Sequence, residues 1–267
     1  MKLCVIGGAG ARSAFLTKSL VKSAREIRVD HIVLLDNNEE HLRTYGQISK
    51  ELARRMEPSL TFDITSDARG ALTGADYIIT TIRAGGDAGR LFDEKTCLAH
   101  GVLGQETTGA GGFAMAIRSV PTLVYYCNPG HLIFNFTNPS GIITQALRSC
   151  GFANVYGICD APSGFIKQLE EILNVPYGAL DIECYGLNHL SWFRNAKLDG
   201  RDVQEELLNN PRTYQHSEMR LFTREMARLS GECMLNEYLY FYYRREKSLS
   251  MVQKAEHPRG EMIYLIN

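Results

Sequence analysis

The stretch KLCVIGGAG, residues 2–10, joins a short apolar run directly to a cluster of glycines. The apolar run predicts a buried β-strand over residues 2–6, and a helical pattern follows over residues 13–26. Glycines between a strand and a helix permit a tight turn and let backbone N–H groups approach a phosphate at the helix N-terminus. The candidate cofactor-binding turn consists of Gly7, Gly8, Ala9 and Gly10.

Asp36 supports this interpretation because it follows the second apolar run, His31–Leu35. A carboxylate at that point of a nucleotide-binding unit accepts hydrogen bonds from a ribose, and it repels a 2′-phosphate. The pattern therefore favours NAD over NADP. The glycine cluster fits G-x-G-x-x-G imperfectly, so the alternative is a purely structural turn followed by an ordinary helix-capping acid.

Strand and helix patterns alternate through the first half of the chain. Further strands are expected over residues 60–65, 75–82, 132–136 and 155–158, with helical stretches between most of them. Such alternation predicts an α/β fold with a doubly wound, Rossmann-like parallel sheet.

The pattern changes beyond residue 160. Two strand-like stretches, residues 181–185 and 189–196, are followed by mainly helical patterns with many charges. We therefore expect an NAD-binding domain over residues 1–160 and an α+β substrate domain over residues 161–267.

The composition excludes several classes of protein. Apolar residues make up 45% of the chain, and 29 Lys and Arg side chains oppose 30 Asp and Glu, for a net charge of −1. This balance provides no field for holding nucleic acid or an anionic membrane. Apolar runs fall far short of the roughly 20 residues of a membrane span, and the chain opens with a strand pattern and not a signal peptide. The seven cysteines form no CxxC pair, which predicts reduced thiols in a cytoplasmic protein.

Polar residues that suit ligand binding follow several of the predicted strands. GQETTGAGG, residues 104–112, brings glycine backbone and the carboxylate of Glu106 into one loop, although a plain surface loop is the alternative. NFTNP, residues 135–139, and GICDAP, residues 157–162, lie where two strands end. Open α/β sheets bind their ligands at this edge, the carboxyl ends of the strands.

Cys159 and His189 are candidate metal ligands. Cys159 lies in GICDAP, and His189 lies in GLNHLSW, residues 186–192. A thiolate and an imidazole can share a divalent ion, although a buried free cysteine and a hydrogen-bonded core histidine are the commoner outcome for such a pair alone. In NEYLYFYY, residues 236–243, four tyrosines lie in a helical pattern, which more often indicates packing than catalysis.

Together these motifs resemble glycoside hydrolase family 4 in order and approximate spacing, along essentially the whole chain. That family is NAD- and manganese-dependent and includes 6-phospho-β-glucosidases, 6-phospho-α-glucosidases and unphosphorylated α-glycosidases. The resemblance implies cleavage of a 6-phosphorylated glucoside by oxidation at C3, removal of the C2 proton, elimination and addition of water, outside the usual two-carboxylate scheme. The implied partner is a sugar phosphate, with no nucleic acid and no membrane.

The resemblance also implies roles for individual residues. Cys159 and His189 would hold Mn²⁺ or another divalent ion, and Tyr238 would be the base at C2. Asp160 corresponds to the suggested acid for the leaving group. The other implied contacts are Asp36 and Arg83 to the cofactor, and Arg83, Glu106, Asn138 and Asn188 to the substrate.

The two cues to the linkage oppose each other. An aspartate after the cysteine, here Asp160, is typical of 6-phospho-α-glucosidases, whereas the NEYLY run is closer to sequences grouped with 6-phospho-β-glucosidases. We favour the β linkage. The alternatives are a 6-phospho-α-glucosidase or α-galactosidase-type member, an NAD-binding relative without turnover, and a hydroxy-acid dehydrogenase. The residues Cys159, His189 and Tyr238 argue against the dehydrogenase.

Two features depart from the family pattern. Ala9 replaces the middle glycine of the turn and Gly10 replaces a serine, so a methyl group is expected close to the phosphate. The chain is also shorter at its C-terminus than family members, which predicts an incomplete substrate domain. An apolar face is then expected to be exposed near residues 215–267, where a dimer or tetramer would cover it.

Overall fold

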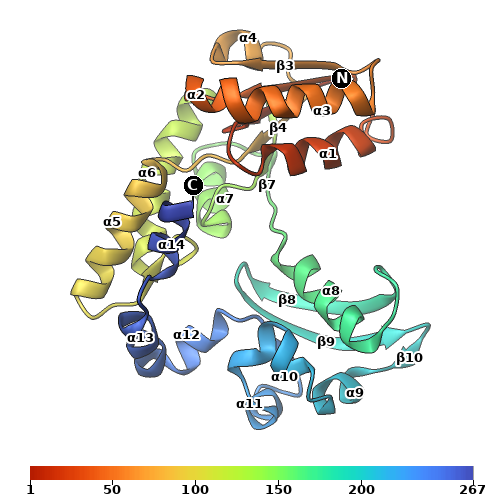
Figure 1. Ribbon diagram of the computed structural model, residues 1–267, viewed down its shortest axis with the longest axis vertical. Helices are drawn as coiled ribbons and strands as arrows, with labels where there is room; N and C mark the ends of the chain where they lie inside the picture. Colours follow the sequence, from red (N-terminus) through yellow and green to blue (C-terminus); the bar gives the residue numbers. More distant parts are fainter. Residues whose placement is uncertain (267) are drawn as a thin grey trace.

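Two β-sheets organise the structure, a computed structural model in which residues 1–266 are described (Figure 1). The first sheet has six strands in the order β3-β2-β1-β4-β6-β7, and all of its pairings are parallel. This confirms the predicted doubly wound, Rossmann-like sheet. The strands are β1 (Lys2–Ile6), β2 (His31–Leu35), β3 (Thr61–Thr65), β4 (Tyr77–Thr80), β6 (Leu132–Asn135) and β7 (Val155–Gly157).

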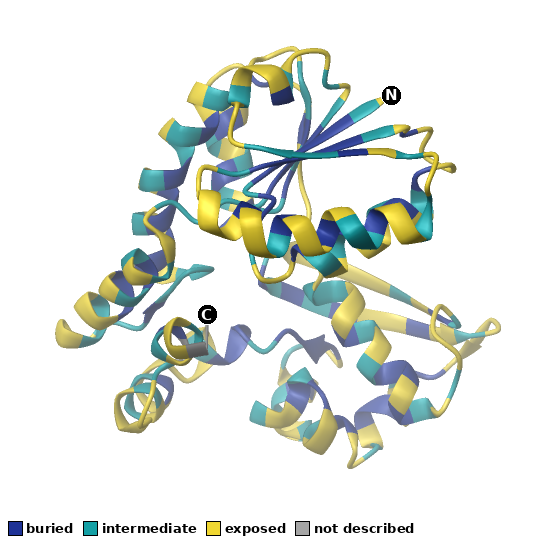
Figure 2. Ribbon diagram, turned by 45° about the horizontal axis from the view of Figure 1, so that its top comes forward, coloured by how far each residue is buried: buried dark blue, intermediate teal, exposed yellow. Residues whose placement is uncertain are grey.

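Helices cover both faces of this sheet because successive strand residues point to opposite sides. Leu3 and Val5 of β1 belong to a core with Val21 and Ala53, whereas Cys4 and Ile6 belong to a second core on the other face. Figure 2 shows the strands buried between helices whose outer faces are exposed. The helices of the first core are α1 (Ser13–Ser23) and α3 (Gln47–Met56), and those of the second are α4 (Ala68–Leu72), α6 (Gly109–Tyr126) and α7 (Ser140–Ser149).

The helical run that precedes β3 is interrupted. The sequence predicts one helix over residues 39–55, whereas the structure has α2 (Glu39–His41), a π-helical segment (Leu42–Gly46) and then α3. The Asn38 side chain accepts the backbone N–H of His41 and caps the start of this run at 3.0 Å.

A long excursion separates β4 from β6. It contains α5 (Gly86–Ala99), the short strand β5 (Gly104–Gln105) and α6. β5 folds back on Thr108 and Gly109 in a tight antiparallel turn, so the glycine-rich loop is ordered and compact. Gln105 is the last residue of β5, and Glu106 follows it as the first residue of the turn that leads to α6.

The second sheet is antiparallel and lies beyond β7. Its strands are β8 (Leu180–Leu187), β9 (Leu190–Leu198), β10 (Arg201–Asp202) and β11 (Met234–Leu235), and β9 pairs with the other three. The core of this region contains Phe165 and Leu169 of α8 (Ala161–Leu173) against Phe193 and Ala196 of β9. The prediction that His189 begins a strand is wrong, because β8 and β9 form a hairpin whose two-residue turn is Asn188-His189.

Short helices complete the second region. The last of them, α14 (Arg259–Ile266), packs against α5, the helix that follows β4 (Figure 1). The buried carboxylate of Glu94 accepts the backbone N–H of Gly260 at 2.6 Å, and Lys95 pairs with Glu261 at 2.8 Å. The remaining elements are α9 (Gln204–Asn209), α10 (Thr213–His216), the 3₁₀ segment η2 (Glu218–Leu221), α11 (Arg224–Leu229), α12 (Leu239–Tyr243) and α13 (Arg245–Lys254).

Within residues 1–266, the helices are all too short or too polar to cross a bilayer.

Candidate active site

The glycine turn is held by backbone hydrogen bonds to the end of β2. The N–H groups of Gly7 and Gly8 both donate to the carbonyl of Leu35, at 2.9 and 3.0 Å. Gly7 has a φ of +81°, and a Cβ there would lie 2.9 Å from the backbone nitrogen of Ile82. Only glycine meets both conditions, since the left-handed region and the close approach each disfavour a side chain.

Asp36 completes the turn. One of its carboxylate oxygens accepts the N–H of Ala9 at 3.0 Å, and the other accepts the N–H of Asn38 at 3.0 Å. Each oxygen retains a lone pair, so the same carboxylate can also accept a ribose hydroxyl. Ala9 itself is wholly buried, and its closeness to a bound phosphate stays a prediction.

The start of α1 keeps donors for a phosphate. Among the described residues, the backbone N–H groups of Gly10, Ala11 and Arg12 have no hydrogen-bond acceptor. A Cβ on Gly10 would meet no heavy atom within 4 Å, so this side of the turn is open. Unused N–H groups at the positive end of a helix suit a pyrophosphate, and the turn therefore fits a dinucleotide.

Cys159 and His189 meet at the junction of the two regions. The Cys159 thiol lies just before α8, and His189 lies at the tip of the β8–β9 hairpin. The Sγ atom of Cys159 is 3.6 Å from Nε2 of His189. At this distance the thiol and the imidazole are in hydrogen-bond contact, and the two ligand types lie close enough together to bind the same ion.

The hairpin turn is built to present this imidazole. His189 has a φ of +59°, in the left-handed region that residues other than glycine rarely adopt. Gly186, with a φ of +116°, precedes the turn, and a side chain there would collide with the carbonyl of Leu190 and the ring of Trp192. No group of three or more His, Cys, Asp or Glu side chains is spaced to bind a metal within residues 1–266.

Tyr238 packs directly on His189. Their ring centroids are 4.5 Å apart with the planes at 67°, an edge-to-face arrangement. Tyr238 is 5% exposed and immediately precedes α12, so it starts the tyrosine-rich helix and does not lie within it. Asp160, by contrast, is exposed, and its carboxylate makes no hydrogen bond within the described chain.

Arg83 and Glu106 form an ion-pair cluster at the start of α5. Arg83 Nε is 2.8 Å from a Glu106 carboxylate oxygen and also pairs with Asp87. Burial lowers the pKa of Arg83, but the Glu106 and Asp87 carboxylates outweigh it and raise this pKa above its ordinary value. Arg90, which is 5% exposed, binds the other Glu106 oxygen at 3.2 Å. Sequence reasoning missed Arg90, since its contact with Glu106 joins two elements that no local spacing connects.

Asn138 extends from a buried polar network at the ends of β4 and β6. The side chain of Asn135 is wholly buried, accepts the Thr80 hydroxyl at 2.8 Å and donates to the carbonyl of Ser140 at 3.2 Å. The Thr137 hydroxyl accepts the N–H of Ile82 at 3.1 Å. These bonds fix the loop that carries Asn138 at the carboxyl edge of the sheet.

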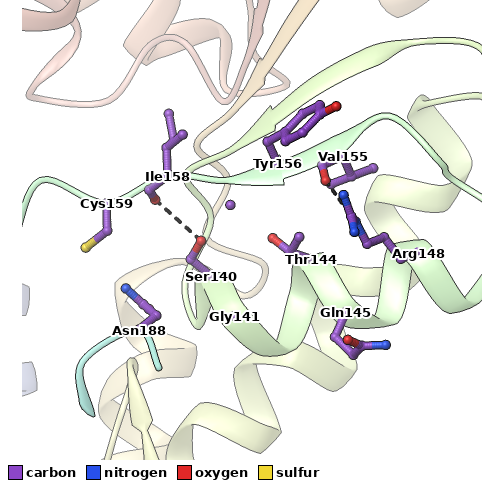
Figure 3. Close-up of a pocket in the computed structure, with 11 residues that line it drawn as sticks. Ser140, Gly141, Thr144, Gln145, Arg148, Val155, Tyr156, Ile158, Cys159 and Asn188 are labelled. Carbon is purple, nitrogen blue, oxygen red and sulfur yellow. Dashed lines mark hydrogen bonds between the residues drawn. The ribbon is translucent and has the colours of Figure 1, made fainter. Parts of the chain in front are cut away.

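Two clefts adjoin Cys159 on either side. One, of about 370 Å³, lies along α7 and β7 and is lined by Ser140, Thr144, Gln145 and Arg148 (Figure 3). The other, of about 410 Å³, lies along β8 and includes His189 and Asn236. Asn188 lines both clefts. Of the predicted catalytic and substrate-binding residues, five line neither of these two clefts: Arg83, Glu106, Asn138, Asp160 and Tyr238.

The first strand of the doubly wound sheet ends at an anion-binding turn, and a cysteine–histidine pair lies beyond its last strand. These features define a nucleotide-binding α/β protein with a candidate metal centre. Comparison with known families makes the assignment specific. Residues 2–175 match the model of the family 4 glycosyl hydrolases, and residues 184–266 match the model of their C-terminal domain. The chain belongs to the family 4 glycosyl hydrolases.

Similar sequences carry both linkage names. The chain is 34% identical over 216 residues to 6-phospho-beta-glucosidase BglT of Thermotoga maritima, a match that covers 79% of this chain and 51% of that protein. It is 31% identical over 266 residues to phospho-alpha-glucosidase PagL of Clostridium acetobutylicum, covering 90% of this chain and 59% of that protein. The chain is therefore shorter than these relatives, and spans little more than half of their length.

Solved structures share the fold throughout the chain. The 6-phospho-beta glucosidase from Thermotoga maritima, with manganese, NAD⁺ and glucose-6-phosphate, has a TM-score of 0.87 and 30% identity, covering 100% of this chain and 66% of that one. A 6-phospho-alpha-glucosidase from gut microorganisms, in complex with NAD and Mn²⁺, has a TM-score of 0.86 and 27% identity, covering 98% and 65%.

Proposed function

We propose that this chain forms the NAD- and metal-binding part of a glycosidase that acts on a 6-phosphorylated glucoside. The observation that carries the proposal is the cluster of Cys159, His189 and Tyr238, in which two metal-ligand types and a phenol meet at the carboxyl edge of the sheet. The similarity to proteins named for 6-phosphoglucoside hydrolysis, solved with NAD, Mn²⁺ and glucose-6-phosphate, supports the substrate class.

The residues of this chain divide the work between them. The turn at Gly7–Gly10 and Asp36 binds NAD, and Cys159 with His189 binds Mn²⁺. When bound, NAD accepts and returns a hydride and Mn²⁺ polarises the sugar oxygens, which makes the proton at C2 acidic. Tyr238 removes that proton, since its phenol lies against the metal-binding imidazole.

Other residues orient the sugar and assist the leaving group. Asp160 is exposed beside Cys159 and protonates the departing glycosidic oxygen. Asn188, between the two clefts, and Asn138 hydrogen-bond to sugar hydroxyls. Arg83 and Glu106 lie beside the substrate and the cofactor as an ion pair. Because the two side chains bind each other, they have fewer free atoms for contacts with either ligand.

We further propose the β linkage. The chain is also 31% and 29% identical to two further proteins with 6-phospho-beta-glucosidase in their names, from Bacillus subtilis and Escherichia coli. Asp160 and the similarity to PagL favour the α linkage instead. The linkage is therefore tested directly in the experiment below.

We also divide the chain into two domains, residues 1–160 and residues 161–267. We propose these as the NAD-binding and substrate domains, supported by the separate cores around the two sheets. We also propose self-association, because apolar side chains are exposed on the C-terminal helices. These side chains are Leu229, Tyr242, Met251, Met262 and Leu265.

The test is release of nitrophenol from the α and β nitrophenyl glucoside 6-phosphates, with NAD⁺ and Mn²⁺ each present or omitted. Release that needs both additions is expected, with the β substrate faster. Release without NAD⁺ would contradict the mechanism, and a faster α substrate would contradict the linkage. NAD⁺ binding with no release from either substrate would contradict the proposed activity and favour a cofactor-binding chain without turnover.

A further inference from the structure

The turn that carries Tyr238 is held by a carboxylate from a different element. Tyr238 follows β11, and the intervening residues are Asn236 and Glu237. One oxygen of Glu218, in η2, accepts both the Asn236 side-chain amide at 2.8 Å and the backbone N–H of Glu237 at 3.2 Å. A single carboxylate oxygen therefore fixes two successive residues directly before the phenol.

Asn236 passes this constraint to Tyr238. Its side-chain oxygen accepts the backbone N–H of Tyr238 at 3.1 Å, while its amide nitrogen donates to Glu218. Its own backbone N–H donates to the carbonyl of Ser191 at 3.1 Å, two residues beyond His189. Asn236 is 2% exposed, so bonds that it loses cannot be replaced by water at low cost.

Glu218 is itself anchored on the other side of the site. Its backbone N–H donates to the side-chain oxygen of Gln168 at 2.9 Å, and Gln168 lies on α8, the helix that starts just after Cys159. The next residue, Met219, is wholly buried, and its sulfur accepts the N–H of Leu235 at 3.0 Å. The carboxylate is thus carried by a segment with little freedom to move.

We propose that Glu218 is a positioning residue that holds Tyr238 against His189. The proposal rests on the proposed function, because positioning matters only if the Tyr238 phenol takes a proton. Glu218 lies one step away from the reacting groups and acts through Asn236. Misplacement of a reacting group by about 1 Å can lower a rate about a hundredfold, so loss of this carboxylate is expected to reduce turnover without weakening binding.

The kinetic test compares Glu218→Ala with Glu218→Gln. Glu218→Ala is expected to lower kcat at least about tenfold while KM, NAD⁺ affinity and Mn²⁺ affinity stay unchanged. Glu218→Gln retains an oxygen that can accept the same two N–H groups and is expected to recover most of kcat. The matched control is Glu225→Ala on α11, a carboxylate in an exposed ion pair with Arg228, which is expected to match the wild type. Equal kcat in Glu218→Ala and wild type would overturn the proposal.

Coupling to Asn236 separates positioning from a general loss of stability. If Glu218 acts through Asn236, the double variant Glu218→Ala/Asn236→Ala loses no more kcat than the worse single variant. Fully additive losses would overturn the route through Asn236. All variants are compared well below their own melting temperatures.

Amide hydrogen exchange decides the proposal even if the chain shows no turnover. Exchange over residues 236–238 is expected to accelerate in Glu218→Ala and to stay unchanged in Glu225→Ala. Unchanged exchange over these residues in Glu218→Ala would overturn the proposal whether or not the wild type is active. Accelerated exchange together with an inactive wild type would support the role of Glu218 in holding Tyr238 and would contradict the proposed function.

Discussion

The glycine turn and the Cys159–His189–Tyr238 cluster are assembled in opposite ways. The turn uses backbone donors from one strand–helix unit, together with a carboxylate 27 residues from Ala9. The cluster uses side chains from three separate elements, with 30 residues between Cys159 and His189 alone. The residues of the glycine turn are therefore restricted mainly by the space available for a side chain, because their contacts are made by backbone groups. At the cluster, side-chain identity determines the chemistry.

The largest effect is expected at Tyr238. Tyr238→Phe keeps the ring that packs on His189 and removes only the hydroxyl, so NAD⁺ binding should not change. A general base contributes about 10² to 10⁴ in rate, and we expect solvent deuterium incorporation at C2 and turnover to fall by that factor. Tyr242→Phe, at an exposed tyrosine of the same run, is the control. Undiminished exchange in Tyr238→Phe would remove Tyr238 as the base.

The metal site should respond less steeply. Cys159→Ser replaces a soft thiolate by a hydroxyl that is a poorer ligand, and Mn²⁺ affinity is expected to fall roughly tenfold to a hundredfold. Isothermal titration with Mn²⁺ measures this without any need for turnover. Cys150→Ser, at an exposed free cysteine after α7, should leave the titration unchanged. An identical affinity in Cys159→Ser would remove the thiol from the site.

A smaller effect is expected at Asp36, the side chain that completes the glycine turn. Asp36→Ala removes the carboxylate expected to accept a ribose hydroxyl, and a hydrogen bond to a charged group contributes about 1.5 kcal/mol or more, so NAD⁺ affinity should fall about tenfold. Fluorescence titration with NADH measures the change. Asp63→Ala, at a surface carboxylate on β3, is expected to bind the cofactor normally. If Asp36→Ala bound NADPH no better than wild type, the carboxylate would not be the group that selects against the 2′-phosphate.

The smallest effect is a pH dependence of stability at Glu218. Burial raises the pKa of this carboxyl from 4.5 to about 7, with Glu237 and Cys184 close to it and Arg220 opposing the shift. Between pH 4.5 and about 7 the folded chain keeps a proton that the unfolded chain has lost, so the free energy of unfolding falls as the pH rises. The fall is expected to be about 1 kcal/mol, because partial exposure screens the charge.

Urea denaturation at pH 4.5 and pH 7.5 measures this fall in the free energy of unfolding. Glu218→Gln cannot titrate, so its free energy of unfolding should rise relative to the wild type across the interval. Parallel pH profiles for the two proteins would show that Glu218 keeps an ordinary pKa.

The same contrast explains how far the sequence could predict the structure. Hydrophobic periodicity and glycine placement are local, so the parallel sheet, its glycine turn and the position of Asp36 follow from the pattern alone. The bounds of β1 and β2 are as predicted. The placement of His189 on a strand was wrong because a two-residue hairpin turn depends on the register of β8 and β9, which no local pattern contains.

The contacts between distant side chains could not be predicted in the same way. Arg90 binds Glu106 across two elements, and Glu218 binds the turn before Tyr238 from η2. Neither contact has a sequence spacing that identifies it, since tertiary packing alone brings the elements together. The resemblance to a family brought Cys159, His189 and Tyr238 together as a set, and the structure places the three side chains in contact.

The seating of α14 on α5 gives the second region two points of attachment. The chain leaves the parallel sheet after β7 and meets the first region again at Gly260. The backbone N–H of Gly260 donates to the buried carboxylate of Glu94 on α5. A hinge at the β7–α8 link alone would pull Gly260 away from Glu94 and break the Lys95–Glu261 pair. The second region is therefore tied to the first both through the covalent β7–α8 link and through the contact of α14 with α5.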